Sequence, residues 1–111
     1  MTISIWDQHT ALALSETATV EELARYRVER GAVLSVNVGY APQTYGDVLA
    51  LLAHYRSGVE SHSDLALAGS VDDIDRITGS DRIAVIFDLE DARPLDGDLN
   101  NLSALYQRGV R

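Results

Sequence analysis

The chain has 111 residues, which is enough for one domain with a modest core. It has no cysteine, which excludes disulfides, thiolate metal sites and cysteine nucleophiles and agrees with a reducing compartment. Its formal charge of −8 argues against nucleic-acid binding, because a phosphate-binding surface needs clustered Lys and Arg. The first residues lack the basic and apolar regions of a leader, and no apolar run approaches the ~20 residues that span a bilayer. We therefore expect a soluble, cytoplasmic protein that binds neither nucleic acid nor membrane.

The first part of the chain predicts two strands with a helix between them. Residues Ile3–Trp6 predict a short strand, and the β-branched run Ala32–Val38 predicts a buried one. Between them, Thr19 and Glu22 have the spacing of a capping box and predict a helix that Gly31 ends. Basic and acidic residues alternate on this helix, which predicts a solvated face: Arg25, Arg27 and Arg30 lie among Glu21, Glu22 and Glu29.

The rest of the chain predicts further strand and helix segments in alternation. From Tyr45 to Val59 apolar residues recur at the i, i+3, i+4, i+7 spacing of one buried helix face. The strand Ile83–Leu89 begins with five apolar residues, as expected of a parallel strand covered on both sides or lining a barrel. The other predicted segments are a short apolar run at Leu65–Ala68, a helix capped by Ser70 and ended by Gly79, and a last helix from about Asp98 to Gly109, with Leu99, Leu102, Leu105 and Tyr106 on one face.

This alternation predicts an α/β protein with parallel strands. Residues 1–111 would make the first three to four β/α units of a (β/α)8 TIM-type barrel, which needs ~250 residues when complete. Such a partial barrel should leave an apolar strand edge after Ile83–Leu89, which predicts a homo-oligomer or a partner chain that supplies the rest. A self-contained sandwich of four strands is the alternative.

Polar side chains gather where the predicted strands end, which is where parallel α/β folds place their chemistry. The first strand ends in Asp7 and His9, and the strand Ile83–Leu89 ends in an acidic stretch with Asp88, Glu90 and Asp91. Histidine and carboxylate together suit a divalent ion such as Zn²⁺, although each residue alone is more often a packed or capping residue. Other polar residues predict structural roles, namely His54 and His62 in and after the long helix and Asp72, Asp73 and Asp75 at a helix N-terminus. The sequence has no P-loop, nucleophile elbow or dinucleotide-binding glycine pattern.

Two segments resemble a known family. The run IAVIFDLEDARPLDGDLNNLSALYQRGVR, residues 83–111, resembles the part of membrane (renal) dipeptidase-like zinc peptidases in which a buried strand delivers a metal-bridging glutamate. A Leu-Tyr-x-x-Gly-Val-Arg ending follows in that family, and residues 105–111 match it. The segment Asp7–Leu12 is similar to the family's Asp-x-His-x-Asp-Leu motif at the end of the first barrel strand.

The resemblance implies a two-metal Zn²⁺ site and hydrolysis of dipeptides or related small amides. It implies that His9 is a metal ligand and that Glu90 is the bridging ligand. It also implies that Asp7 orients His9 without contacting the metal itself. The family's second aspartate corresponds to Ala11, which cannot coordinate a metal. The alternatives are a non-catalytic scaffold that has lost the metal centre, marked by Ala11, and a small α/β binding domain.

Overall fold

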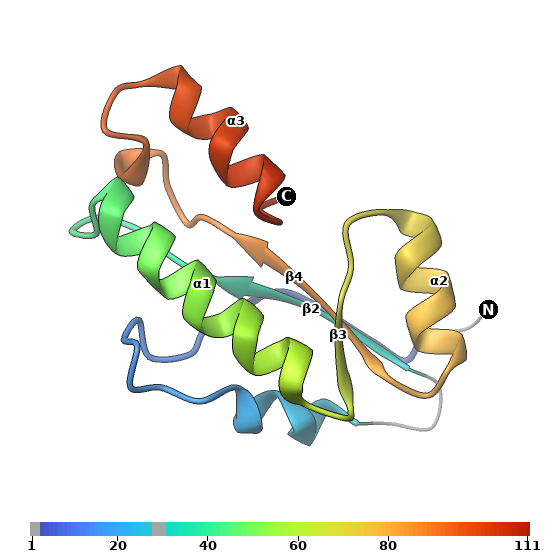
Figure 1. The fold of residues 1–111 in the computed structure, drawn as a ribbon. Helices are drawn as coiled ribbons and strands as arrows, with labels where there is room; N and C mark the ends of the chain where they lie inside the picture. Colours follow the sequence, from blue (N-terminus) through green and yellow to red (C-terminus); the bar gives the residue numbers. More distant parts are fainter. Residues whose placement is uncertain (1–2, 28–30) are drawn as a thin grey trace.

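A computed structural model describes residues 3–27 and 31–111. The elements alternate as the sequence predicts (Figure 1). In chain order they are β1 (Ile5–Thr10), the 3₁₀ helix η1 (Val20–Tyr26), β2 (Ala32–Asn37), α1 (Tyr45–Ser61), β3 (Leu65–Leu67), α2 (Val71–Gly79), β4 (Ile83–Asp88), the 3₁₀ helix η2 (Arg93–Leu95) and α3 (Leu99–Gln107).

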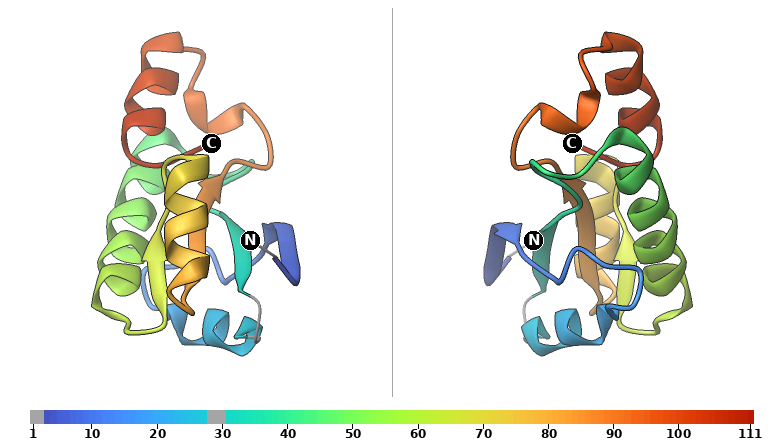
Figure 2. Two further views of the ribbon diagram at one scale, coloured as in Figure 1. Left: turned by 90° about the vertical axis from the view of Figure 1, so that its right-hand side faces the viewer. Right: turned by 90° about the vertical axis from the view of Figure 1, so that its left-hand side faces the viewer.

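The four strands form one sheet in the order β1-β2-β4-β3, and every pair is parallel. The chain passes from β2 to the far edge through α1, and then returns through α2 to place β4 between β2 and β3. Crossovers between parallel strands are right-handed, so reversing the direction of travel moves the second helix to the opposite face. The two views of Figure 2 show α1 and α2 on different sides of the sheet. The predicted α/β class with parallel strands is confirmed.

Each face of the sheet buries its own set of side chains. On one face, Leu34 and Val85 pair in register and belong to the main core with Tyr55 of α1. On the other face, Val33 and Ala84 pair in register and pack in a second cluster with Ile74 and Ile77 of α2. Helices on both sides explain why β2 and β4 are buried along their whole length.

The outer edge of β4 is paired, although the sequence predicts a bare apolar edge there. Strand β3 pairs with β4 over Ile83–Val85, and Val110 forms a bridge with Phe87 further along the same edge. The N–H of Arg111 donates to the carbonyl of Phe87 at 2.9 Å. The free edges of the four-stranded sheet are therefore β1 and β3.

The first strand and the first helix differ from their predictions. Strand β1 runs from Ile5 to Thr10 instead of ending at Trp6, because an edge strand exposes alternate side chains and can remain paired through polar residues. The predicted α-helix is the 3₁₀ helix η1, which ends at Tyr26, and Arg30 and Glu29 lie outside the described residues. The predicted capping box at Thr19 does not form, since its hydroxyl accepts from the N–H of Glu21 and not from that of Glu22.

The later elements follow their predictions closely. Thr44 caps α1 in a capping box with Asp47, and Ser70 caps α2. Strand β4 ends at Asp88, one residue before its predicted end. Of the predicted apolar face of α3, Leu105 is buried, whereas three large apolar side chains remain exposed: Leu99, Leu102 and Tyr106. None of the helices in the described part is long and apolar enough to cross a membrane.

Candidate metal centre

The ring of His9 lies between two carboxylates at the carboxyl ends of β1 and β4. Its Nδ1 is 2.9 Å from Oδ1 of Asp88, and its Nε2 is 3.9 Å from Oε2 of Glu90. The side chains of His9 and Glu90 are 45% and 54% exposed, whereas that of Asp88 is 12% exposed. The ring therefore bridges a buried acid and an acid that is open to solvent.

Asp88 ends β4 and is fixed from the neighbouring strand. The hydroxyl of Ser35 in β2 donates to Oδ2 of Asp88 at 2.6 Å, and Ser35 is completely buried. The two strands are paired in parallel register, with Asn37 opposite Asp88. Residues 35, 37 and 88 thus share one face of the sheet, because side chains two positions apart in a strand point the same way. The sequence places Asp88 among the acids at the end of β4, and nothing in it indicates a role for Ser35.

Glu90 lies two residues beyond β4 in a short loop. Its backbone N–H donates to the carbonyl of Gly39 at 2.9 Å, which fixes this loop to the one after β2. Within the part of the chain that the structure describes, the carboxylate makes one ion-pair approach, to His9 at 3.9 Å, and it is accessible to an ion or a ligand. This placement agrees with the expectation that strand ends carry the chemistry.

Asp7 contacts the backbone of His9 and not its ring. Its Oδ1 accepts from the N–H of His9 at 3.1 Å, and its Oδ2 accepts from the hydroxyl of Tyr26 at 3.0 Å. The pairing register of β1 with β2 shifts between Asp7 and Thr10, because a local side-chain acceptor replaces a ladder partner there. Burial tends to raise the pKa of Asp7, but the hydrogen bonds from His9 and Tyr26 outweigh it and hold that pKa below its ordinary value. Hydrogen bonding to Asp7 correspondingly raises the pKa of Tyr26.

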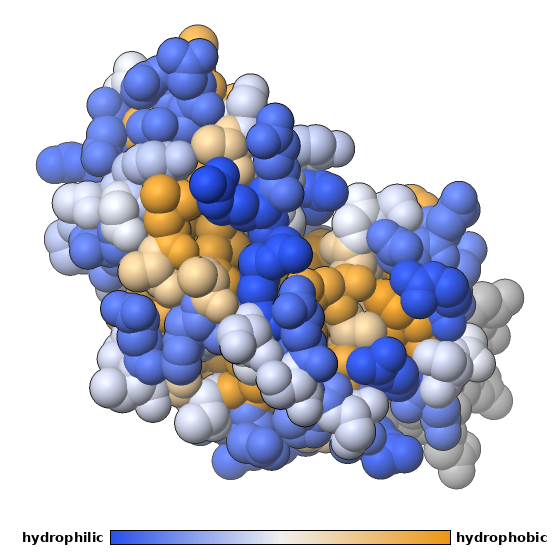
Figure 3. Space-filling model, viewed as in Figure 1, coloured by the Kyte–Doolittle hydropathy of each residue, from blue (hydrophilic) through white to orange (hydrophobic). Residues whose placement is uncertain are grey.

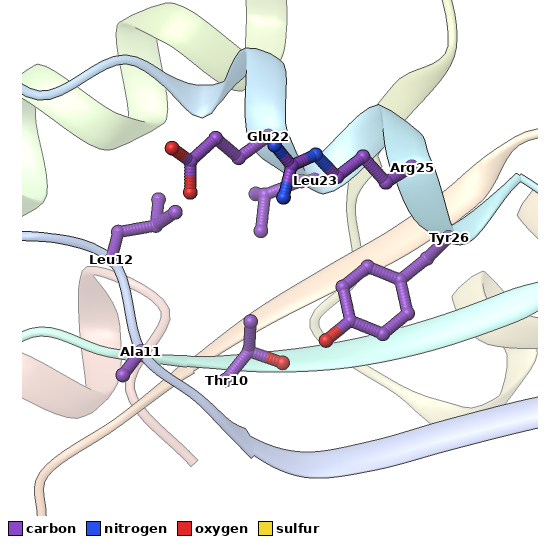
Figure 4. Close-up of a pocket in the computed structure, with 7 residues that line it drawn as sticks. All are labelled: Thr10, Ala11, Leu12, Glu22, Leu23, Arg25 and Tyr26. Carbon is purple, nitrogen blue, oxygen red and sulfur yellow. The ribbon is translucent and has the colours of Figure 1, made fainter.

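A cavity of about 320 Å³ lies between the end of β1 and η1 (Figure 4). It is lined by Thr10, Ala11 and Tyr26 among others, and neither His9 nor Glu90 belongs to its lining. The Thr10 hydroxyl lies near Asp7 and helps to lower the pKa of that carboxyl. Its buried oxygen has no hydrogen-bond partner among the described residues. Ala11 is exposed just past β1 and brings no ligand to the His9 site.

The two other histidines bind the segment around η1. His54 Nε2 is 2.6 Å from the carbonyl oxygen of Ala18, and His62 Nε2 is 3.3 Å from Oε2 of Glu21. Both rings lie on or just after α1, away from the carboxyl ends of the strands. Their contacts hold residues 18–21 against α1, as expected of structural residues.

The His9 and Glu90 side chains fit two positions of a zinc coordination shell. Zinc binds histidine nitrogen and carboxylate oxygen at about 2.0–2.2 Å, so two such ligands at a tetrahedral angle lie roughly 3.3–3.6 Å apart around a shared ion. The observed 3.9 Å between Nε2 and Oε2 is longer than a direct hydrogen bond and slightly longer than this spacing, so a small closing movement of the exposed Glu90 side chain would let both atoms contact one ion. Within residues 3–27 and 31–111, no group of three His, Cys, Asp or Glu side chains could hold an ion. The described residues therefore offer His9 and Glu90 as two candidate ligands and do not complete a metal site by themselves.

Comparison with known proteins identifies the family. The family model described as membrane dipeptidase, peptidase family M19, matches residues 3–111. The chain belongs to this family. The match confirms the predicted resemblance and covers both the segment around His9 and the segment around Glu90. No curated protein matches the chain significantly in sequence.

A solved structure supports the fold. An amidohydrolase from Pseudomonas aeruginosa superimposes with a TM-score of 0.75 at 14% identity, over 95% of this chain and 31% of that one. The chain thus spans about a third of the length of that protein. In this chain, β1, β2, β4 and the bridge at Val110 lie next to one another in parallel, with β3 as a short strand beside them. The predicted partial barrel is confirmed.

Proposed function

We propose that this chain carries part of the active site of a metal-dependent dipeptidase that hydrolyses dipeptides or related small amides. The observation that carries the proposal is the approach of His9 Nε2 to Glu90 Oε2 at 3.9 Å, at the strand ends of a dipeptidase-family fold. His9 and Glu90 would hold the metal, with Zn²⁺ as the expected ion. Membership of the family supports the reaction class, and the donor types support the metal.

The chain's own residues have separable tasks in this proposal. A zinc ion, when bound, supplies Lewis-acid polarisation of the amide carbonyl and lowers the pKa of a water nucleophile. His9 offers a neutral nitrogen, and Glu90 offers a carboxylate that can contact more than one ion. Asp7 shapes the end of β1 through the backbone of His9. The remaining ligands of a two-metal site would come from residues outside the described set, since Ala11 offers none.

The activity is tested with the zinc-loaded chain in the oligomer or complex that supplies the remaining ligands, on a panel of dipeptides that differ in side-chain size and charge. We expect zinc-dependent release of free amino acids that is lost in Glu90→Ala. The Asp91→Ala variant is the control, because Asp91 is the next acid in the loop and accepts hydrogen bonds from backbone N–H groups of Ala41 and Arg93. Hydrolysis that is equal in Glu90→Ala and the wild type would contradict the assignment.

A second candidate is a non-catalytic member of the family that keeps the scaffold. Two observations favour it: Ala11 occupies a ligand position by resemblance, and no three potential ligands converge within the described residues. The two candidates differ in zinc retention. A folded chain that retains no zinc after loading and dialysis supports the scaffold and contradicts the enzyme.

Cellular context is part of the same proposal. We place the protein in the cytoplasm, which agrees with the absence of cysteine. We also propose that it self-associates or binds a partner chain that completes the barrel, because large apolar side chains of α3 remain exposed.

A further inference from the structure

We propose that Asp88 is a positioning residue that holds the ring of His9 with Nε2 directed at Glu90 and at an incoming divalent cation. This inference rests on the proposed function, in which His9 Nε2 is a metal ligand. The contact that carries it joins Nδ1 of His9 to Oδ1 of Asp88 at 2.9 Å.

The chemistry of the contact fixes the proton of a neutral His9 ring. An ionised carboxylate only accepts hydrogen bonds, so the nitrogen that faces Asp88 must be the donor. The neutral ring then carries its proton on Nδ1, and the lone pair of Nε2 is free on the side of Glu90. That lone pair is what a metal ion needs from histidine.

Asp88 is itself held rigidly, as a positioning group must be. Its second oxygen accepts the Ser35 hydroxyl at 2.6 Å, and both residues lie on the paired central strands β2 and β4. Asp88 is nearly buried, whereas His9 is half exposed, so the acid anchors a ring that solvent would otherwise leave free to rotate. The Ser35 hydroxyl donates to Asp88 and does not contact the ring, which excludes a serine nucleophile activated by His9 in this arrangement.

Asp88 acts through His9 and is not a ligand in this geometry. It contacts Nδ1, on the other edge of the ring from the nitrogen that faces Glu90. The three groups do not surround a common point, in agreement with the absence of a three-ligand group among the described residues. The arrangement is that of a carboxylate, a histidine and a metal in series, in which the carboxylate sets the tautomer and orientation of the ligand.

The first test measures the His9 tautomer in the metal-free chain by ¹⁵N NMR, at a pH where the ring is neutral. The three histidines are assigned with His9→Gln, His54→Gln and His62→Gln. We expect the proton of His9 on Nδ1. A proton found mainly on Nε2 would overturn the proposal, and this measurement on the wild type needs no altered residue near the site.

The second test compares Asp88→Asn and Asp88→Ala with the wild type. Both should increase the Nε2–H form of His9, with Asp88→Ala the stronger because Asn keeps an acceptor oxygen. Zinc affinity, measured by competition with a chromophoric chelator, should fall about 10–100-fold in Asp88→Ala. The control is Asp75→Ala, which removes the same charge from an exposed site on α2. Unchanged tautomer populations in folded Asp88 variants would contradict the proposal, whereas a wild type that binds no zinc contradicts the proposed function.

Discussion

The backbone N–H of Glu90 donates to the carbonyl oxygen of Gly39 across 2.9 Å, so the loop that carries the candidate ligand depends on the loop after β2. A Cβ atom at Gly39 would lie 2.5 Å from Cγ2 of Val48, which is fully buried in α1. Valine is stiff about χ1, so the clash must move α1 or the loop. We expect Gly39→Ala to lower the free energy of unfolding by about 1–3 kcal/mol and to shift the amide resonance of Glu90.

The matched control is Gly79→Ala at the end of α2. A Cβ there meets nothing within 4 Å, and alanine favours the helix over glycine. Urea unfolding should therefore show Gly79→Ala at or above wild-type stability. Equal destabilisation by the two substitutions would show that the clash with Val48 is not the reason why Gly39→Ala lowers the stability.

Tyr55 should make the fold sensitive to alkaline pH. Burial raises the pKa of Tyr55 to about 12 from an ordinary 10.0, and its hydroxyl donates to the carbonyl of Ala13. A raised pKa means that the unfolded chain loses this proton first. The associated stability is therefore complete below pH 10 and is lost as the pH rises towards 12, by about 1.4 kcal/mol per pH unit.

Tyr55→Phe should flatten that alkaline decline in the free energy of unfolding. At neutral pH it should cost about 1–2 kcal/mol, because the Ala13 carbonyl loses its donor. Tyr106→Phe, at an exposed tyrosine, is the control and should leave the pH profile of urea unfolding unchanged. A wild-type profile that is level from pH 10 to about 12 would contradict the buried-phenol explanation.

Asp73 should contribute to the acid dependence of stability. The backbone N–H of Gly69 and the guanidinium of Arg76, each at 2.9 Å, hold the pKa of Asp73 below its ordinary 3.8. The stability from this carboxylate is present above pH 3.8 and is lost as the pH falls through the lowered pKa. Asp73→Asn should remove that part of the acid titration, and Asp75→Asn, at an exposed acid on the same helix, should not.

The surface of α3 predicts association. Leu99 and Tyr106 are 77% and 58% exposed, with exposed Leu102 between them on the same helix. Figure 3 shows hydrophobic surface where α1 and α3 approach each other and near α2. We expect light scattering to find oligomers or aggregates of the chain, and Leu99→Ser with Leu102→Ser to shift them towards monomer. A monomeric wild type that melts cooperatively would contradict this prediction.

Much of the fold could be predicted because patterning and capping agree with the final structure. The run Ile83–Phe87 is apolar throughout because helices or other elements cover both faces of β4. The extent of β1 could not be predicted, since its polar second half is paired through backbone groups alone. The insertion of β4 between β2 and β3 depends on long-range pairing that a local pattern does not encode.

The sequence predicts the two exposed candidate ligands but not the residues that support them. His9 and Glu90 are predicted from the strand ends and from a family motif. Asp88 and Ser35 had a weaker signal, because polar residues at every second position in AVLSVNV and after IAVIF mark one polar face. Only the parallel register of β2 and β4 shows that Ser35 and Asp88 lie on the same face of the sheet.

The most direct test of the central claim is zinc retention by the chain after loading and dialysis, measured by elemental analysis. We expect the wild type to retain zinc, and His9→Ala and Glu90→Ala to lose it while remaining folded by circular dichroism. His62→Ala, which removes a histidine far from the strand ends, should retain zinc like the wild type. Retention that is equal in the wild type, His9→Ala and Glu90→Ala would contradict the assignment of these two residues as the metal ligands.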